Sequence, residues 1–243
     1  MDIKIYNNAE EIGCAAAQLY KELINGNPSA VLGLATGATP VPTYKKLIEL
    51  YKNGEISFKD VTTFNLDEYC DLDKHDKNSY YTFMHENLFN YIDIKEENVN
   101  FLDGNAKDCD AESKRYAEAI RAAGGIDLQL LGIGTNGHIA FNEPADKFTD
   151  EAFKVTLTQS TINSNQKYFG DVPMPRHAMT MGIGSIMRSK KILLIATGES
   201  KAKAIKAMVS GEITPQIPCS ILNEHKDVVI MLDKAAASLI ENK

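Results

Sequence analysis

The sequence predicts an α/β fold, a mostly parallel, Rossmann-like sheet with helices on both faces. Two observations carry this prediction. Apolar strand-like segments and amphipathic helix-like segments alternate from one end of the chain to the other, which is typical of a parallel sheet covered by helices. No repeat, low-complexity tract or linker interrupts the alternation, so we expect a single domain over residues 1–243.

The first half of the chain is expected to alternate helix and strand. In order, the expected elements are a helix over residues 10–24, a strand over 30–34, a helix beginning at Thr39-Pro40, a strand over 61–66, and helices over 79–89 and 108–123. In the first helix, apolar residues recur at helical spacing (Ile12, Ala15, Ala16, Leu19, Leu23). Thr39 is a capping residue, and Pro40 favours the first helical position.

The second half contains strongly apolar strand candidates over residues 127–133, 191–196 and 227–232. Ser200 is expected to cap a helix after the second of these, and an Ala-rich helix is expected after the third. Between the first two strands, residues 143–176 mix Pro, Asp, Ser and Asn with weak periodicity. Two interpretations stay open for this region: a mobile lid around residues 145–176, or an exposed excursion of the chain.

The composition excludes several classes of partner. The chain has a formal net charge of −7 and no run of five Lys or Arg residues, whereas a surface that binds nucleic acid or membrane normally shows a basic patch. An acidic chain can still bind a small anion through a few well-placed cations. We therefore expect a small-molecule substrate, and no nucleic-acid or membrane partner.

The cysteines and the N-terminus favour the cytoplasm. The four cysteines are scattered and form no CxxC pair, which is typical of reduced thiols and not of a disulfide framework or a zinc site. The N-terminal residues lack the basic and apolar regions of a signal peptide, and no apolar run approaches the roughly 20 residues that a membrane span needs. We expect a cytoplasmic protein without a metal site.

Two strand-to-helix loops are candidates for binding a phosphate. The first contains Thr36, Gly37, Ala38 and Thr39, whose backbone N–H groups and hydroxyls could surround an anion at a helix N-terminus; a tight turn is the alternative, and the loop lacks the GKS/T ending of a Walker motif. In the second loop Lys201 lies in the first turn of a helix, where a cation opposes the helix dipole unless it reaches a bound anion. Lys167 is either a second phosphate contact or a solvated side chain.

Two further loops carry groups suited to proton transfer. Asp67 follows the strand over 61–66 and is either a general base or a helix cap. The segment 132–144 has glycines at 132, 134 and 137, suited to close backbone approach or positive φ, followed by His138 and then Glu143. A His beside a carboxylate is a common proton-transfer pair, because the acid fixes the tautomer of the ring.

These segments resemble the glucosamine-6-phosphate deaminase (isomerising) family, part of the glucosamine/galactosamine-6-phosphate isomerases and related to the 6-phosphogluconolactonases. The resemblance covers essentially the whole chain and includes residues 34–40, the FNLDEY of residues 64–69, residues 79–81, residues 132–144, and Gly198 with Lys201-Ala202. The combination of FNxDEY with GHIAFNEP is specific. Lactonases of the same fold usually have a different sequence after the His, of the type GHTASLFP, and they lack the NEP.

The resemblance implies an enzyme that converts D-glucosamine 6-phosphate and water to D-fructose 6-phosphate and ammonia, in amino-sugar (N-acetylglucosamine) breakdown. It implies no metal and no organic cofactor. By the same resemblance, His138 opens the pyranose ring by proton transfer at the ring oxygen, and Glu143 and Asn136 belong to that relay. Asp67 abstracts the C2 proton and returns it to C1.

The resemblance also assigns the phosphate to the loop from Thr36 to Thr39 and to Lys201, with Lys167 where many members have Arg. The chain departs from the family at two places. Asn136 stands where many members have Asp, so we expect Glu143 alone to stabilise the imidazolium while Asn136 orients the imidazole through a hydrogen bond. Residues 145–147 replace the Ser pair with which allosteric hexameric members bind N-acetylglucosamine 6-phosphate, so we expect no such activation and a monomer or small homo-oligomer.

Two alternatives compete with the deaminase. A 6-phosphogluconolactonase would not need Asp67 with Glu-Tyr after it, nor the NEP. A sugar-phosphate-binding sensor on the same fold would normally carry a DNA-binding appendage and would be expected to lack the catalytic acid, whereas Asp67, His138 and Glu143 are all present.

Overall fold

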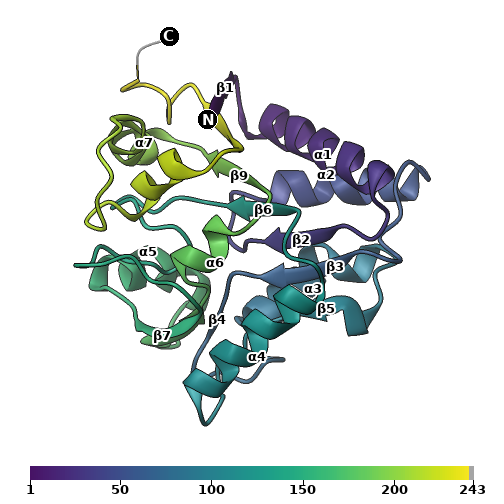
Figure 1. The fold of residues 1–243 in the computed structure, drawn as a ribbon, viewed down its shortest axis with the longest axis horizontal. Helices are drawn as coiled ribbons and strands as arrows, with labels where there is room; N and C mark the ends of the chain where they lie inside the picture. Colours follow the sequence, from purple (N-terminus) through teal and green to yellow (C-terminus); the bar gives the residue numbers. More distant parts are fainter. Residues whose placement is uncertain (241–243) are drawn as a thin grey trace.

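The centre of the protein is a seven-stranded sheet whose neighbouring strands all run parallel. The computed structural model describes residues 1–240, without the side chain of Ser164. Across the sheet the order is β1 (Asp2–Tyr6), β10 (Val228–Asp233), β9 (Lys191–Ala196), β6 (Leu128–Leu131), β2 (Val31–Leu34), β3 (Thr62–Asn65) and β5 (Val99–Asn100) (Figure 1). The inner strands β9, β6, β2 and β3 are buried almost throughout. The residues of β9, β6 and β2 are mostly apolar, as is typical of a parallel sheet covered on both faces, whereas β3 also buries Thr63 and Asn65.

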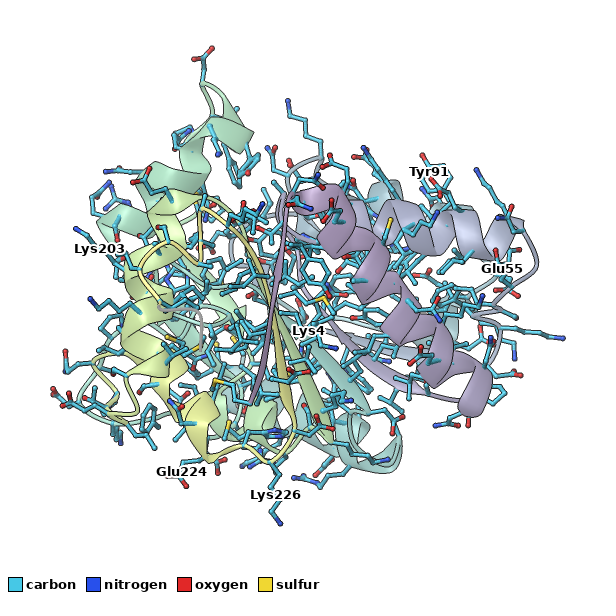
Figure 2. The ribbon with its side chains drawn as sticks, turned by 90° about the horizontal axis from the view of Figure 1, so that it is seen from above. Lys4, Glu55, Tyr91, Lys203, Glu224 and Lys226 are labelled. Atoms are coloured by element: carbon cyan, nitrogen blue, oxygen red, sulfur yellow. The ribbon has the colours of Figure 1, made fainter. Side chains whose placement is uncertain are left out.

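Helices cover both faces of this sheet, which confirms the predicted fold class. Helices α1 (Ala9–Gly26) and α2 (Val41–Lys52) lie side by side on one side, and α7 (Ala202–Val209) lies on the other (Figure 2). The remaining helices are α3 (Tyr80–Asn87), α4 (Cys109–Ala122), α5 (Gln159–Phe169) and α6 (Ile183–Met187). Four short 3-10 segments occupy Phe89–Tyr91, Glu96–Asn98, Glu199–Lys201 and Pro218–Glu224. No helix in residues 1–240 is long and apolar enough to cross a membrane.

The topology marks one place in the sheet for a ligand. From β2 the chain continues outward through β3 to β5, whereas from β6 it continues in the opposite direction through β9 to β10. The neighbours β2 and β6 therefore form a switch point, where the loops after two adjacent strands diverge and leave a crevice at their carboxyl ends. These two loops are the Thr36–Thr39 loop and the glycine-rich segment that contains His138.

A second, antiparallel sheet was not predicted. It consists of β4 (Asp67–Tyr69), β8 (His177–Thr180) and β7 (Phe153–Thr156), and it has its own apolar cluster, which includes Tyr69 and Phe141. The prediction of an irregular region over residues 143–176 is therefore wrong, because β7 and α5 lie within it. The mobile lid around residues 145–176 and the exposed excursion of the chain both stay predictions. The single domain over residues 1–243 also stays a prediction.

The predicted start of α2 is one residue early. Residues 38–40 form a turn in which the Val41 N–H lies 3.4 Å from the Ala38 carbonyl. Pro40 is the cap residue, and no side chain caps the helix. Thr39 therefore lies inside the turn and does not cap α2.

The predicted cap of α7 and the predicted last helix are also wrong. A 3-10 turn over Glu199–Lys201 precedes α7, so the cap residue is Lys201 and Ser200 lies inside that turn. Residues 234–240 form turns in place of an Ala-rich helix. Their backbone hydrogen bonds span three residues, as from Ser238 N–H to Ala235 O, or four, as from Ala237 N–H to Asp233 O, and do not continue as a regular helix. Residues 241–243 of that expected helix lie outside the described part.

Candidate active site

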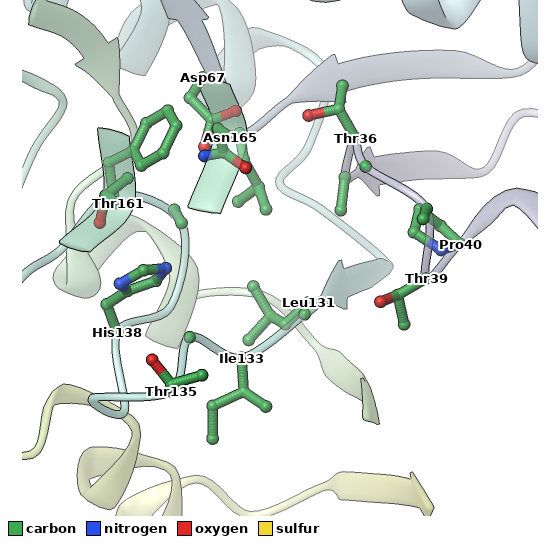
Figure 3. A pocket seen from close by; sticks show the side chains of 18 of the residues that line it. Thr36, Thr39, Pro40, Asp67, Leu131, Ile133, Thr135, His138, Thr161 and Asn165 are labelled. Carbon is green, nitrogen blue, oxygen red and sulfur yellow. The ribbon is translucent and has the colours of Figure 1, made fainter. Parts of the chain in front are cut away.

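A cavity of about 560 Å³ opens at the switch point between β2 and β6. Its wall is built by the loops after β2, β6 and β9, by the start of β4, and by one face of α5. In Figure 3, Thr36 and Thr39 lie on one side of the cavity, and His138, Thr161 and Asp67 lie across from them. The structure thus places the predicted phosphate-binding residues in the wall of one cavity, together with three of the predicted catalytic residues, Asp67, Asn136 and His138. The fourth, Glu143, does not line the cavity but contacts His138.

The phosphate side of the cavity combines a backbone turn with two lysines. Gly37 has φ +96°, a conformation that L residues rarely adopt, so the turn between Thr36 and Thr39 depends on glycine. Lys201 and Lys167 both line the cavity. Burial lowers the pKa of the Lys201 ammonium, and the nearby charge of Lys167 lowers it further. Two cations that face one cavity are suited to a phosphate.

Asp67 lies in β4, not in a loop, and it does not cap a helix. It pairs with Thr180 of β8, and only 7% of its surface is exposed. Its side chain lines the cavity. Burial raises the pKa of Asp67 to about 8, and the charge of Glu68 adds to the shift. A carboxyl whose pKa lies near neutrality is well matched to abstracting a proton from carbon.

The adjacent Glu68 has a structural role, because its carboxylate accepts three backbone hydrogen bonds. Its Oε1 accepts the backbone N–H groups of Tyr69 at 2.8 Å and Tyr80 at 3.0 Å, and its Oε2 accepts that of Tyr81 at 2.9 Å. Glu68 therefore fastens β4 to the N-terminus of α3, where a negative charge is favourable. Its fixed position keeps a negative charge beside Asp67.

His138 and Glu143 lie close enough to act as the proton-transfer pair that the sequence predicts. The ring Nδ1 of His138 lies 3.3 Å from Oε2 of Glu143. Burial alone would raise the pKa of Glu143. The hydrogen bonds from His138, Thr161 and Asn136, together with the charge of His138, outweigh burial and lower the pKa to about 2. An ionised carboxylate can only accept, so Nδ1 carries the hydrogen and Nε2 of the neutral ring is the nitrogen free to take a proton.

Asn136 supports this pair differently from the expectation. Its amide Nδ2 donates to Oε2 of Glu143 at 2.7 Å, and its Oδ1 accepts the backbone N–H of His138 at 3.2 Å. Asn136 thus orients the carboxylate and the loop, and makes no hydrogen bond to the imidazole ring.

The glycines of this segment have separate roles. A Cβ on Gly134 would lie 2.4 Å from the His138 ring, so the close approach of the ring requires glycine. Gly137 has φ +86° and its carbonyl accepts the Cys219 N–H. Gly132 meets neither condition, because its φ is not in the left-handed range and nothing lies within 4 Å of a Cβ there.

Several cavity residues were missed by the sequence analysis. Tyr80 lines the cavity, and its hydroxyl lies 2.9 Å from that of Tyr69. Asn165 and Thr161 line it from α5. The only signal for Tyr80 was its place in residues 79–81, which carry the resemblance, and the polar sequence of α5 gave no signal for the other two.

Fold and site together define the class of protein: an α/β enzyme whose cavity places a buried carboxyl group and a His–carboxylate pair opposite groups suited to a small anion. The family model for glucosamine-6-phosphate isomerases/6-phosphogluconolactonase matches residues 7–231. The chain therefore belongs to this family.

Relatives with high identity extend over the whole chain. Glucosamine-6-phosphate deaminases of Thermoanaerobacter pseudethanolicus and Mycoplasma mycoides subsp. mycoides are each 50% identical to it, over 100% of this chain and 96% and 98% of their own lengths. The structure of a monomeric glucosamine-6-phosphate deaminase superimposes with a TM-score of 0.95 at 43% identity, and covers 98% of this chain and 100% of its own. A 6-phosphogluconolactonase of Trypanosoma brucei has a TM-score of 0.75 at 19% identity over 99% of this chain and 98% of its own, which shows the shared fold alone.

Proposed function

We propose that the protein is an isomerising deaminase that converts D-glucosamine 6-phosphate and water to D-fructose 6-phosphate and ammonia, in amino-sugar breakdown. The main support is the geometry of one cavity. Asp67 and the His138–Glu143 pair lie across it from the Thr36–Thr39 loop and the two lysines, which are suited to binding a phosphate. The full-length relatives of 50% identity support the same reaction.

The first half of the proposed reaction opens the pyranose ring. The Thr36–Thr39 loop, Lys201 and Lys167 bind the phosphate and so place C1 and the ring oxygen next to His138. Nε2 of His138 takes up and returns the proton that moves from the C1 hydroxyl to the ring oxygen as the C1–O5 bond breaks. Glu143 stabilises the imidazolium during the transfer, because its ionised carboxylate lies against Nδ1.

The second half moves a proton between carbons and releases ammonia. The ionised Asp67 abstracts the C2 proton of the open-chain aldehyde, and a proton from solvent adds to the C1 oxygen to complete an enolamine; the same proton returns to solvent when ammonia leaves. Asp67 then returns its proton to C1, which leaves an iminium at C2. Water adds to this iminium, ammonia leaves, and the product is the 2-ketose. The buried site favours these steps because the pKa of Asp67 is close to that of a proton-transfer base at neutral pH.

We also propose that the enzyme works in the cytoplasm as a monomer or small homo-oligomer. All four cysteines carry free thiols, as expected in a reducing compartment. The monomeric deaminase that superimposes on the chain supports the simple assembly.

The test is to incubate the purified protein with glucosamine 6-phosphate and to measure ammonia and fructose 6-phosphate together. Equimolar release of both is expected, and the Asp67→Asn variant is the matched control that should release neither. Intact substrate, or ammonia without the ketose, would overturn the proposal. Hydrolysis of 6-phosphogluconolactone in place of deamination would assign the lactonase activity, and binding without turnover would assign a sensor.

A further inference from the structure

We propose that Thr161, the third residue of α5, is a positioning residue that holds Glu143 in place for ring opening. The inference rests on the proposed function, because it concerns the relay assigned to His138 and Glu143. Neither the sequence patterns nor the resemblance assigns Thr161 a role. Its evidence is the set of hydrogen bonds around one carboxylate.

All acceptor positions of the Glu143 carboxylate are occupied. Oε2 receives the amide of Asn136 at 2.7 Å and faces Nδ1 of His138 at 3.3 Å. Oε1 receives the hydroxyls of Thr158 at 3.0 Å and of Thr161 at 2.5 Å. A carboxylate has about four acceptor sites. The four donors therefore fix both the position of the carboxylate and its rotation about the Cγ–Cδ bond.

The two threonines are not equivalent. Thr158 is the cap residue of α5: its Oγ1 accepts the Thr161 N–H at 3.3 Å and lies 3.0 Å from the hydroxyls of both Ser160 and Thr161. Its single proton thus has several acceptors within reach. Thr161 is only 4% exposed, and its hydroxyl donates to Glu143. A buried hydroxyl depends on such a partner.

This contact bears on the chemistry because the imidazole is held by the carboxylate. Glu143 must stay ionised and directed at Nδ1 while the proton is on Nε2 of His138. Without the Thr161 hydroxyl, Oε1 keeps one donor, and the carboxylate can turn away from the ring. The phosphate site is expected to keep its geometry, because Lys201 and the Thr36–Thr39 loop lie on other elements and Lys167 lies six residues further along α5.

The test compares Thr161→Val, which removes the hydroxyl and keeps the shape, with Thr161→Ser, which keeps the hydroxyl. For Thr161→Val, kcat is expected to fall roughly ten- to hundredfold, the effect of losing one hydrogen bond to a charged group. Its KM should stay near that of the wild type. The pH dependence of kcat on the acidic side follows Asp67, whose pKa lies far above that of Glu143, so the pH profile should keep its shape while kcat falls at every pH. Thr161→Ser should restore kcat.

Two further measurements separate this role from a structural one. Binding of 2-amino-2-deoxyglucitol 6-phosphate, an open-chain analogue with no ring to open, should be unchanged in Thr161→Val. Thr161→Ala, which also lacks the hydroxyl, must reproduce the fall in kcat at unchanged KM if Thr161→Val does not fold. A wild-type kcat in the hydroxyl-free variants would overturn the inference, as would equal loss in Thr161→Ser. A wild-type protein that does not deaminate would instead overturn the proposed function.

Discussion

At the scale of single residues, the ionised form of Asp67 that the proposed reaction needs is costly to the fold, because this carboxyl group is buried. Burial raises its pKa from 3.8 to about 8, so the folded chain holds this proton more tightly than the unfolded chain. Ionisation of Asp67 therefore destabilises the folded state progressively as the pH rises from about 4 to about 8. The Asp67→Asn variant should lack deaminase activity, yet unfold above about pH 8 with a free energy higher by roughly 1–3 kcal/mol.

The measurement for Asp67→Asn is denaturant unfolding below about pH 5 and above about pH 8, since the stabilisation should appear only at the higher pH. Asp146→Asn is the matched control, because Asp146 is exposed on the loop after Pro144. An equal gain for Asp67→Asn at both pH values would contradict the assigned cost, as would an equal gain in the control.

Glu143 is the second residue whose charge the site depends on. Glu143→Gln keeps the length of the side chain but removes the charge that stabilises the imidazolium of His138. We expect kcat to fall by about 10²–10⁴, with little change in KM because the phosphate contacts lie elsewhere. Steady-state kinetics of ammonia release measure both constants. Turnover like that of the wild type would refute the role of Glu143 in ring opening.

At the scale of elements, the loop before α7 and the helix α5 supply the two lysines. Lys201 is half-buried at the start of α7, whereas Lys167 is exposed near the end of α5, with its ammonium 5.0 Å from the Tyr168 ring centre. An ion pair gains more from a less solvated cation. Lys201→Met should therefore raise KM by roughly ten- to hundredfold, and Lys167→Met by less.

Lys203→Met is the control for these lysine variants, because Lys203 lies on α7 but points to the surface (Figure 2). Inhibition by inorganic phosphate gives an independent readout and should weaken in the same order as KM rises. Equal effects of the three substitutions would show that the net charge, and not the cavity, controls binding.

The elements that could be predicted are those whose burial pattern is simple. The inner strands are nearly continuous apolar runs and α1 is a regular amphipathic helix, so the strands over 31–34 and 191–196 and the helix over 9–26 were found within two residues. The edge strand β1 was missed because its residues are mostly exposed. The short antiparallel strands were missed because three or four residues do not establish a period.

The site, like the fold, was predictable only in part. Asp67, His138 and Glu143 follow recognisable strand ends, so the sequence located them. The supports of Glu143 were not found, because Thr158 and Thr161 belong to a helix with a largely polar sequence, whose position depends on tertiary packing. That Asn136 bonds the carboxylate and not the ring likewise depends on the fold of the loop.

At the scale of the whole molecule, the switch point places every proposed role within one chain. The loops after β2, β6 and β9, the start of β4 and one face of α5 all come from the same 243 residues. The segment that follows Glu143 is held internally, since the Ala145 N–H donates to the Pro215 carbonyl and Gln216 donates to the Ala145 carbonyl. The cavity and the contacts of His138 thus already include every residue to which the proposed reaction assigns a role.

Kinetics without cooperativity are the expected consequence. A complete site that is not coupled to other copies gives hyperbolic saturation, because no second site biases its equilibrium. We expect a monomer of 26.8 kDa or a small multiple of that mass by light scattering at assay concentrations, a hyperbolic rate curve with glucosamine 6-phosphate, and no response to N-acetylglucosamine 6-phosphate. A hexamer with sigmoidal kinetics that the acetylated sugar phosphate makes hyperbolic would contradict this expectation.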